Sequence, residues 1–129
     1  MKMRCYSLEE IKHKYINTSA CLVLFGSGVI GQVVTPELLS KHNLYDKIDC
    51  YIDNDSAKWN TTITVKDKQL EVKSPEYLKQ CDKKTIIIIN ISRYAQVLEQ
   101  LEQMECTKGM TAIIMPMLLI DNANVNIKM

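Results

Sequence analysis

A glycine-rich loop is the feature of this sequence whose residue types and spacing point most directly to chemistry. Residues 26–31 read Gly-Ser-Gly-Val-Ile-Gly, the G-x-G-x-x-G pattern of loops that cradle a diphosphate. Gly26 permits a tight turn, Gly28 leaves the backbone open to a phosphate, and Gly31 lets a helix approach a strand closely. Backbone N–H groups at the helix start then hold the diphosphate. The predicted contact residues are Gly26, Ser27, Gly28, Val29, Ile30 and Gly31.

An acidic residue follows at the distance that such a loop requires. Asp53 lies 22 residues beyond Gly31, directly after the apolar segment 47–52. We expect its carboxylate to accept hydrogen bonds from ribose hydroxyls, and its charge disfavours a 2′-phosphate, so NAD is preferred to NADP. The alternative is that the glycines only form a compact turn and that Asp53 is a turn or cap residue.

A second candidate loop follows the isoleucine-rich segment 85–91. Asn90, Ser92 and Arg93 fall at the predicted carboxyl edge of the sheet, beside the glycine loop. Ligands of open α/β sheets bind at that edge. We therefore expect Asn90 and Ser92 to contact a ribose or base, and Arg93 to contact a phosphate. The alternative is that Ser92 only caps the next helix.

The sequence offers no self-sufficient catalytic set. None of the six tyrosines has a lysine four residues later, so the Tyr-x-x-x-Lys pair of short-chain dehydrogenases and epimerases is absent. No Gly-Lys-Ser/Thr follows the glycine loop, which excludes a nucleoside-triphosphatase loop. His13 and His42 are interpreted as solvated helix residues. The chain is predicted to bind a ligand without catalytic residues of its own.

The elements around these loops alternate between strand and helix. The predicted strands are 21–25, 47–52, 85–91 and 112–115, with a hairpin or bent edge strand over 63–72. The predicted helices are 7–16, about 31–42, 74–81 and 94–104. Pro36 is expected to kink or split the second helix. This alternation predicts a Rossmann-like α/β domain: a doubly wound, mainly parallel sheet of order 3-2-1-4-5 with helices on both faces.

Length and composition fit one domain over residues 1–129, divided into an N-terminal helix (1–19), a βαβ core (20–118) and a frayed tail (119–129). A net charge of +1 and 6% aromatic residues argue against a dedicated nucleic-acid binder. The apolar stretches are too short to span a membrane. Five scattered cysteines without a C-x-x-C pair predict reduced thiols, a cytoplasmic location and no metal site.

The order of the motifs resembles a known type of domain. The sequence reads LVLFGSGVIG at 22–31, IDND at 52–55, KW at 58–59 and VKSPEYL at 72–78. Over about residues 20–105 this order resembles the small Rossmann-like domains of bacterial surface-polysaccharide enzymes. These enzymes are relatives of nucleotide-sugar epimerases and dehydratases, sugar acyltransferases and certain methyltransferases. Asn60 departs from the pattern, because a glycine is more usual after the Lys-Trp pair.

The resemblance implies an accessory domain that binds NAD(P) or a nucleotide sugar, and a UDP-sugar in members with an acyltransferase partner. It implies Gly26, Ser27 and Gly28 at the diphosphate. It implies Asp53 with Asn54 at a ribose or base. Two alternatives stay open: a nucleotide-sugar oxidoreductase or epimerase whose catalytic part is missing from this chain, and an interaction module without a ligand. A catalytic domain or self-association is the expected protein partner, with no nucleic acid and no membrane.

Overall fold

The strands of the sheet come from the most apolar segments of the chain. The computed structural model describes residues 2–3 and 21–116. The inner strands are β2 (Leu22–Phe25), β3 (Ile48–Ile52), β6 (Ile86–Ile89) and β7 (Thr111–Ile114). The β6 strand consists of four isoleucines, and all four are fully buried. Branched side chains of this kind suit a strand that is packed on both faces.

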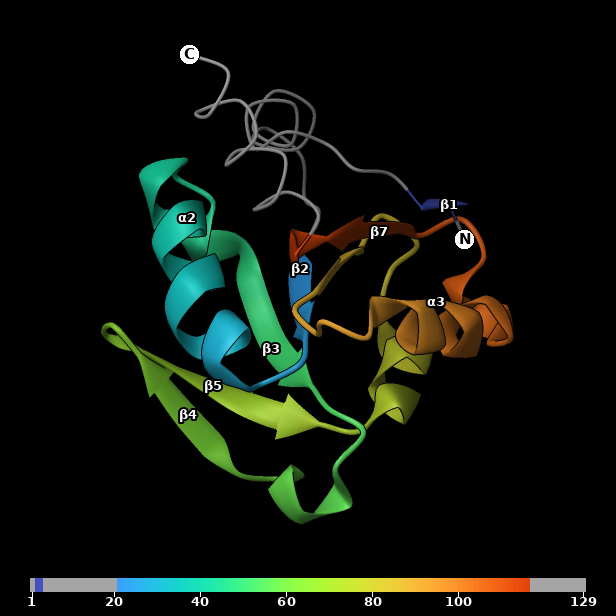
Figure 1. Ribbon diagram of the computed structural model, residues 1–129, viewed down its shortest axis with the longest axis horizontal. Helices are drawn as coiled ribbons and strands as arrows, with labels where there is room; N and C mark the ends of the chain where they lie inside the picture. The colour runs from blue at the N-terminus through green and yellow to red at the C-terminus, as the bar shows by residue number, and fades with distance from the viewer. Residues whose placement is uncertain (1, 4–20, 117–129) are drawn as a thin grey trace.

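One mixed sheet holds the strands of the described residues (Figure 1). Their order is β1-β7-β6-β2-β3-β5-β4. Every neighbouring pair from β1 to β5 is parallel, whereas β4 (Thr62–Val65) and β5 (Lys68–Lys73) form an antiparallel hairpin. The predicted α/β class is therefore confirmed, as is the predicted hairpin within residues 63–72.

The first residues of the chain depart from the sequence prediction. Lys2–Met3 form a short strand, β1, which pairs in parallel with Thr111 and Ala112 of β7. The predicted N-terminal helix over 1–19 is thus wrong at these two positions, because pairing with the open edge of β7 satisfies their backbone polar groups. The predicted helix at 7–16 and the predicted tail at 119–129 lie outside the described residues.

The sheet carries two separate apolar clusters, because alternate side chains of a strand point to opposite faces. One cluster contains Leu22 and Leu24 of β2 together with Leu39 of α2 (Thr35–Lys41). The other contains Val23 and Phe25 of β2. With them are side chains of α3 (Tyr94–Glu102) and of the 3-10 helix η4 (Pro75–Gln80), namely Val97, Leu98, Leu101 and Leu78. The glycine loop leaves β2 between these two clusters.

The helical segment after the glycine loop has two parts. A π-helical turn, η1 (Ile30–Val34), runs directly into α2, and the N–H of Thr35 donates to the carbonyl of Ile30. Pro36 is the second residue of α2 and lies inside the continuous helical segment 30–41, where it has no N–H to donate to the preceding turn. The prediction that Pro36 splits this helix is confirmed, and the wider π turn is the form that the split takes.

The remaining helical segments are short. Ser74 accepts a hydrogen bond from the N–H of Glu76, so the predicted helix start is confirmed. The helix itself is 3-10 over Pro75–Gln80. The predicted helix at 94–104 is also present, although α3 ends at Glu102. Three further 3-10 turns were not predicted: η2 (Tyr45–Lys47), η3 (Ser56–Lys58) and η5 (Glu105–Thr107).

Candidate functional site

The candidate site lies at the carboxyl edge of the sheet. Phe25, the last residue of β2, is in register with Ile52 of β3 and Ile89 of β6, so the loops after these strands begin side by side. Ligands of open α/β sheets bind at this edge. The structure thus brings together the three segments selected from the sequence: the glycine loop, residues 53–54 and residues 90–93.

Two of the three loop glycines are required by the fold. Gly26 has a φ of +111°, and a Cβ atom there would lie 2.8 Å from Cγ1 of Ile91. A Cβ atom on Gly31 would lie 2.1 Å from the carbonyl oxygen of Gly26. Only glycine therefore lets the helix start this close to the end of β2. These are the turn and close-approach roles that were predicted for the two residues.

Gly28 is not required by the fold. Nothing lies within 4 Å of the position that its Cβ atom would occupy, and its φ is outside the left-handed range. The residue is exposed, and the neighbouring Val29 is 76% exposed. The backbone at Gly28 therefore faces open space, where the diphosphate was predicted to bind.

The start of the helical segment presents amide groups at this loop. The N–H of Gln32 donates to the carbonyl of Gly28 at 2.9 Å, and the N–H groups of the residues between them precede this first helical bond. The Gln32 side chain donates to the carbonyl of Ser27 at 2.6 Å and holds the loop against the helix. Amides at the positive end of a helix dipole are suited to an anionic ligand.

Asp53 is anchored to the glycine loop. Its Oδ2 atom accepts from the hydroxyl of Ser27 at 2.6 Å and from the N–H of Ser27 at 3.1 Å. Its Oδ1 atom accepts from the N–H of Asp55 at 2.9 Å, and Nζ of Lys58 lies 3.9 Å from Oδ2. Asp53 thus contacts the glycine loop through Ser27, and its predicted contact with a ribose stays a prediction. It also closes an Asx turn, as the structural alternative required.

The environment of Asp53 favours its charged form. Partial burial acts to raise the pKa of the carboxyl group. The hydrogen bonds from Ser27 and Asp55 and the charge of Lys58 outweigh burial, so the pKa is lowered from its ordinary value of 3.8. Since the N–H of Ser27 is already bonded to this carboxylate, the amides left for a diphosphate are those from Gly28 onward.

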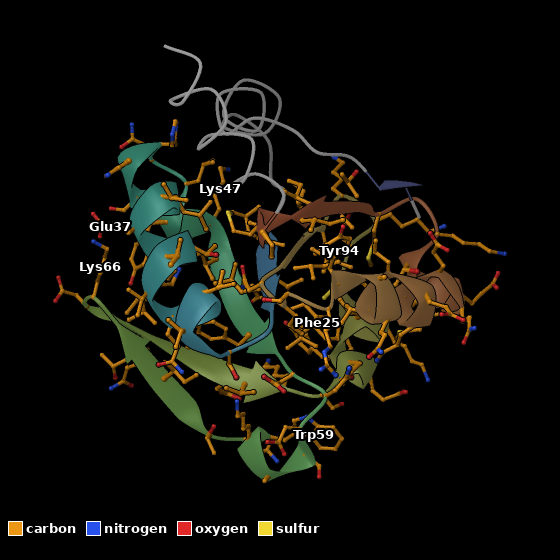
Figure 2. All side chains as sticks on the ribbon, in the orientation of Figure 1. Phe25, Glu37, Lys47, Trp59, Lys66 and Tyr94 are labelled. Carbon is orange, nitrogen blue, oxygen red and sulfur yellow. The ribbon has the colours of Figure 1, made fainter. Side chains whose placement is uncertain are left out.

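Trp59, which is labelled in Figure 2, and Asn54 extend the site beyond Asp53. The indole N–H of Trp59 donates to the carbonyl of Asp53 at 2.7 Å, and the residue is 36% exposed. Asn54 and Gln100 of α3 exchange two hydrogen bonds, of 2.8 and 2.9 Å. A hollow of about 480 Å³ lies beside Trp59, Asn54 and Gln100. Its other lining residues are Ser74, Pro75, Glu76, Gln103 and Met104.

Asn90 is a buried link between the loops. It is 5% exposed, and its Oδ1 atom accepts from the hydroxyl of Thr35 at 2.6 Å. Its Nδ2 atom donates to the carbonyl of Gly26 at 3.4 Å. The amide of Asn90 thus holds the glycine loop in place, and its predicted contact with a ribose or base stays a prediction.

Ser92 and Arg93 are exposed at the same edge. The alternative prediction for Ser92, that it caps α3, is wrong: Arg93 is the N-cap residue and no side chain caps this helix. Tyr94 at the start of α3 packs against the apolar cluster that contains Val97 and Leu98. Ser92 and Arg93 thus stay accessible to a ligand.

The described residues hold no cluster of metal-ligating side chains. Within residues 2–3 and 21–116, no group of three or more His, Cys, Asp or Glu side chains is placed to hold a metal ion.

Burial raises the pKa of the Cys50 thiol to about 12, so this thiol is no nucleophile near neutral pH. No helix in the described part of the chain is long and apolar enough to cross a membrane.

Three residues at the site were not selected from the sequence: Thr35, Trp59 and Gln100. Trp59 is part of the Lys-Trp motif, and a sole tryptophan in a polar stretch is a usable signal for a ligand contact. Thr35 and Gln100 have no comparable signal. Only the tertiary structure brings them to Asn90 and Asn54.

The chain has no match among protein-family models, curated proteins or solved structures. The similarity to the Rossmann-like domains of surface-polysaccharide enzymes therefore stays a prediction, based on the order of the motifs.

Proposed function

We propose that this chain is a Rossmann-like, doubly wound domain that binds NAD or a nucleotide sugar through its glycine loop. We assign it an accessory role in bacterial polysaccharide or nucleotide-sugar metabolism. The parallel order β7-β6-β2-β3-β5 supports the predicted order 3-2-1-4-5. The two apolar clusters, one with α2 and one with α3, support helices on both faces. The free thiols of Cys21, Cys50, Cys81 and Cys106 support a cytoplasmic location.

The observation that carries the proposal is the open backbone at Gly28. Where the native backbone conformation would also suit alanine, glycine costs about 0.4–1 kcal/mol of stability, because glycine has more conformational freedom in the unfolded chain. Gly26 and Gly31 have conformational or packing reasons for this cost, but Gly28 has neither. A ligand that must approach the backbone closely supplies the missing reason, and the adjacent helix start favours an anion.

Asp53 supports a ligand that contains a ribose. Its carboxylate is ionised at neutral pH and lies at the edge of the glycine loop, 2.6 Å from Oγ of Ser27. Ribose hydroxyls are donors to such a carboxylate, whereas a 2′-phosphate is repelled by it. We expect NAD to bind more tightly than NADP. Equal affinities for the two would remove Asp53 from the ligand site.

The test is calorimetric titration of the wild type, Gly28→Val and a control variant with NAD and UDP-glucose. The control is Gln69→Val, which adds a similar branched side chain at an exposed position of the β4–β5 hairpin. We expect Gly28→Val to abolish binding and Gln69→Val to leave it unchanged. Because the valine side chain enters open space, both variants should keep the wild-type circular dichroism. Unchanged affinity of Gly28→Val would contradict the proposal.

A second candidate function, contact with another protein domain or a second copy, is favoured by Val29 and Val33. These residues are 76% and 63% exposed and lie four positions apart at the start of the helical segment. Sedimentation velocity of the wild type and of a Val29→Ser, Val33→Ser double variant tests self-association. A dimer that is lost in the double variant would support this function. A wild type that stays monomeric at high concentration would contradict self-association through this face.

A further inference from the structure

Trp59 presents an aromatic surface in a fixed position. Its indole N–H is bonded to the carbonyl of Asp53 at 2.7 Å, and the preceding turn η3 is capped by the side chain of Asp55, which accepts from the N–H of Ala57 at 3.1 Å. Trp59 nevertheless keeps 36% of its surface exposed. Because the side chain is already ordered, a planar ligand that stacks on it meets a small entropic cost.

The hollow beside Trp59 has the size and lining of a small-molecule site. Its volume of about 480 Å³ falls in the range of about 300–1,000 Å³ that is usual for such sites. Apolar walls come from Trp59, Pro75 and Met104, and amide groups come from Asn54, Gln100 and Gln103. Apolar walls with a few polar groups match a heteroaromatic ring, which has apolar faces and a polar edge.

Asn54 and Gln100 offer the hydrogen-bonding groups that such an edge needs. Each side chain at present donates one hydrogen bond to the other and accepts one in return, at 2.8 and 2.9 Å. Both bonds are exposed to solvent, so breaking them to free the two amides for a ligand costs little free energy. The edge of a nucleobase carries a donor and an acceptor side by side, as a primary amide does.

The hollow is also within reach of the glycine loop. Asp53 links the two, since its carboxylate contacts Ser27 while its carbonyl accepts from Trp59. Asn54 is the next residue along the chain. Asp53 therefore lies between the glycine loop on one side and Trp59, which lines the hollow, on the other.

We propose that the hollow between Trp59 and α3 receives the base of the nucleotide. The indole of Trp59 stacks on the base, and the amides of Asn54 and Gln100 bond to its edge. This inference rests on the proposed function and adds to it a base subsite of which Trp59 is the main element. It explains why a large apolar side chain stays exposed among polar residues at this edge.

Intrinsic fluorescence tests the subsite directly, because Trp59 is the one tryptophan of the chain. Titration with NAD or UDP-glucose is expected to quench or shift its emission. Inorganic pyrophosphate, which has no base, is expected to leave the emission unchanged. In calorimetry, Trp59→Leu is expected to lose about 5- to 150-fold in affinity for the nucleotide, the range found when a stacking aromatic is removed. Trp59→Phe keeps an aromatic ring and is expected to lose less.

A second variant addresses the base edge without touching the indole. Gln100→Leu removes one member of the exposed amide pair and is expected to weaken nucleotide binding several-fold, while Gln69→Val again serves as the control. The inference is overturned if a nucleotide binds the wild type, and is blocked by Gly28→Val, but leaves the emission of Trp59 and the affinity of Trp59→Leu unchanged. That result would leave the proposed function intact. Failure of every nucleotide to bind the wild type would overturn both.

Discussion

Replacing Asp53 by alanine is expected to destabilise the fold as well as the ligand site. The carboxylate accepts three hydrogen bonds: two from Ser27, at 2.6 and 3.1 Å, and one from Asp55 at 2.9 Å. Ser27 is 1% exposed, so water cannot readily replace the lost acceptor. The N–H of Asp55 is in an exposed turn, where water can bond to it. The cost of Asp53→Ala therefore comes mainly from Ser27.

The size of the effect follows from these contacts. A hydrogen bond to a charged group contributes about 1.5–3 kcal/mol, and a buried donor without a partner costs about 1–3 kcal/mol. Because the two bonds from Ser27 share one oxygen and the hydroxyl can rotate, the contributions do not add fully. We expect Asp53→Ala to lower the free energy of unfolding by about 2–4 kcal/mol at pH 7, measured by urea denaturation.

The same contacts make this loss depend on pH. The pKa of Asp53 is lowered in the folded protein from its ordinary value of 3.8. The stabilising contribution of Asp53 is therefore complete above the unfolded-state pKa and is lost as the pH falls through the lower, folded-state pKa. The difference in stability between the wild type and Asp53→Ala should be constant from pH 7 to about pH 5 and should shrink below about pH 4.

Lys58→Ala is the matched control for this experiment. Its amine lies 3.9 Å from Asp53 and its side chain is 45% exposed, so the ion pair is screened by water. Removing it should change the free energy of unfolding by less than about 1 kcal/mol. The reasoning is refuted if Asp53→Ala costs no more than Lys58→Ala, or if its cost is the same at pH 3 and pH 7.

Three further predictions concern buried positions of the fold. Gly31→Ala places a Cβ atom 2.1 Å from the backbone oxygen of Gly26 and should lower the free energy of unfolding, measured by urea denaturation, by about 1–3 kcal/mol or more. Thr35→Val removes a buried donor to Asn90 and should cost about 1–3 kcal/mol, and a variant as stable as the wild type would contradict the predicted role of this bond. Burial raises the pKa of the Cys50 thiol to about 12, so iodoacetamide at pH 8 should leave it unlabelled in the native protein, as mass spectrometry of peptides would show.

The strands could be predicted because burial on both faces dictates residue type. The four isoleucines of β6 are predictable as a strand in almost any context, since few other structures bury such a run completely. The boundaries were less predictable. Thr85 and Asn90 flank this strand and were included in the prediction, but the side chain of Asn90 bonds across the sheet edge instead. The strand β1 had no signal, because two residues are too few for a pattern.

Helix type was the least predictable part of the fold. Ser74 and Pro75 mark a helix start whatever hydrogen-bond pattern follows, so the residue types predicted the start but not the 3-10 geometry. Pro36 is a stronger signal, because a proline cannot donate to the preceding turn. It predicted a break in the helix, although not the π-helical turn that accommodates it.

In the candidate site, too, residues fixed by local structure were predictable, whereas their tertiary partners were not. Gly26, Gly31 and Asp53 were predictable because a strand–turn–helix unit and the neighbouring strand dictate them locally. Their partners depend on contacts between elements distant in the sequence. Thr35 bonds to Asn90, and Gln100 bonds to Asn54. No pattern of residue types marks such contacts in advance.

The motif residues therefore serve two different requirements, which stability and binding measurements separate. Gly26 and Gly31 are needed for the chain to turn and pack, so their replacement should lower stability and binding together. Gly28 faces open space, so its replacement should affect binding alone. Asp53 belongs to both groups, because the bonds that fix its carboxylate beside the loop also satisfy Ser27. A loss of binding in Asp53→Ala thus identifies a ligand contact only where it exceeds the loss in Ser27→Ala, which breaks the same internal hydroxyl bond but leaves the carboxylate in place.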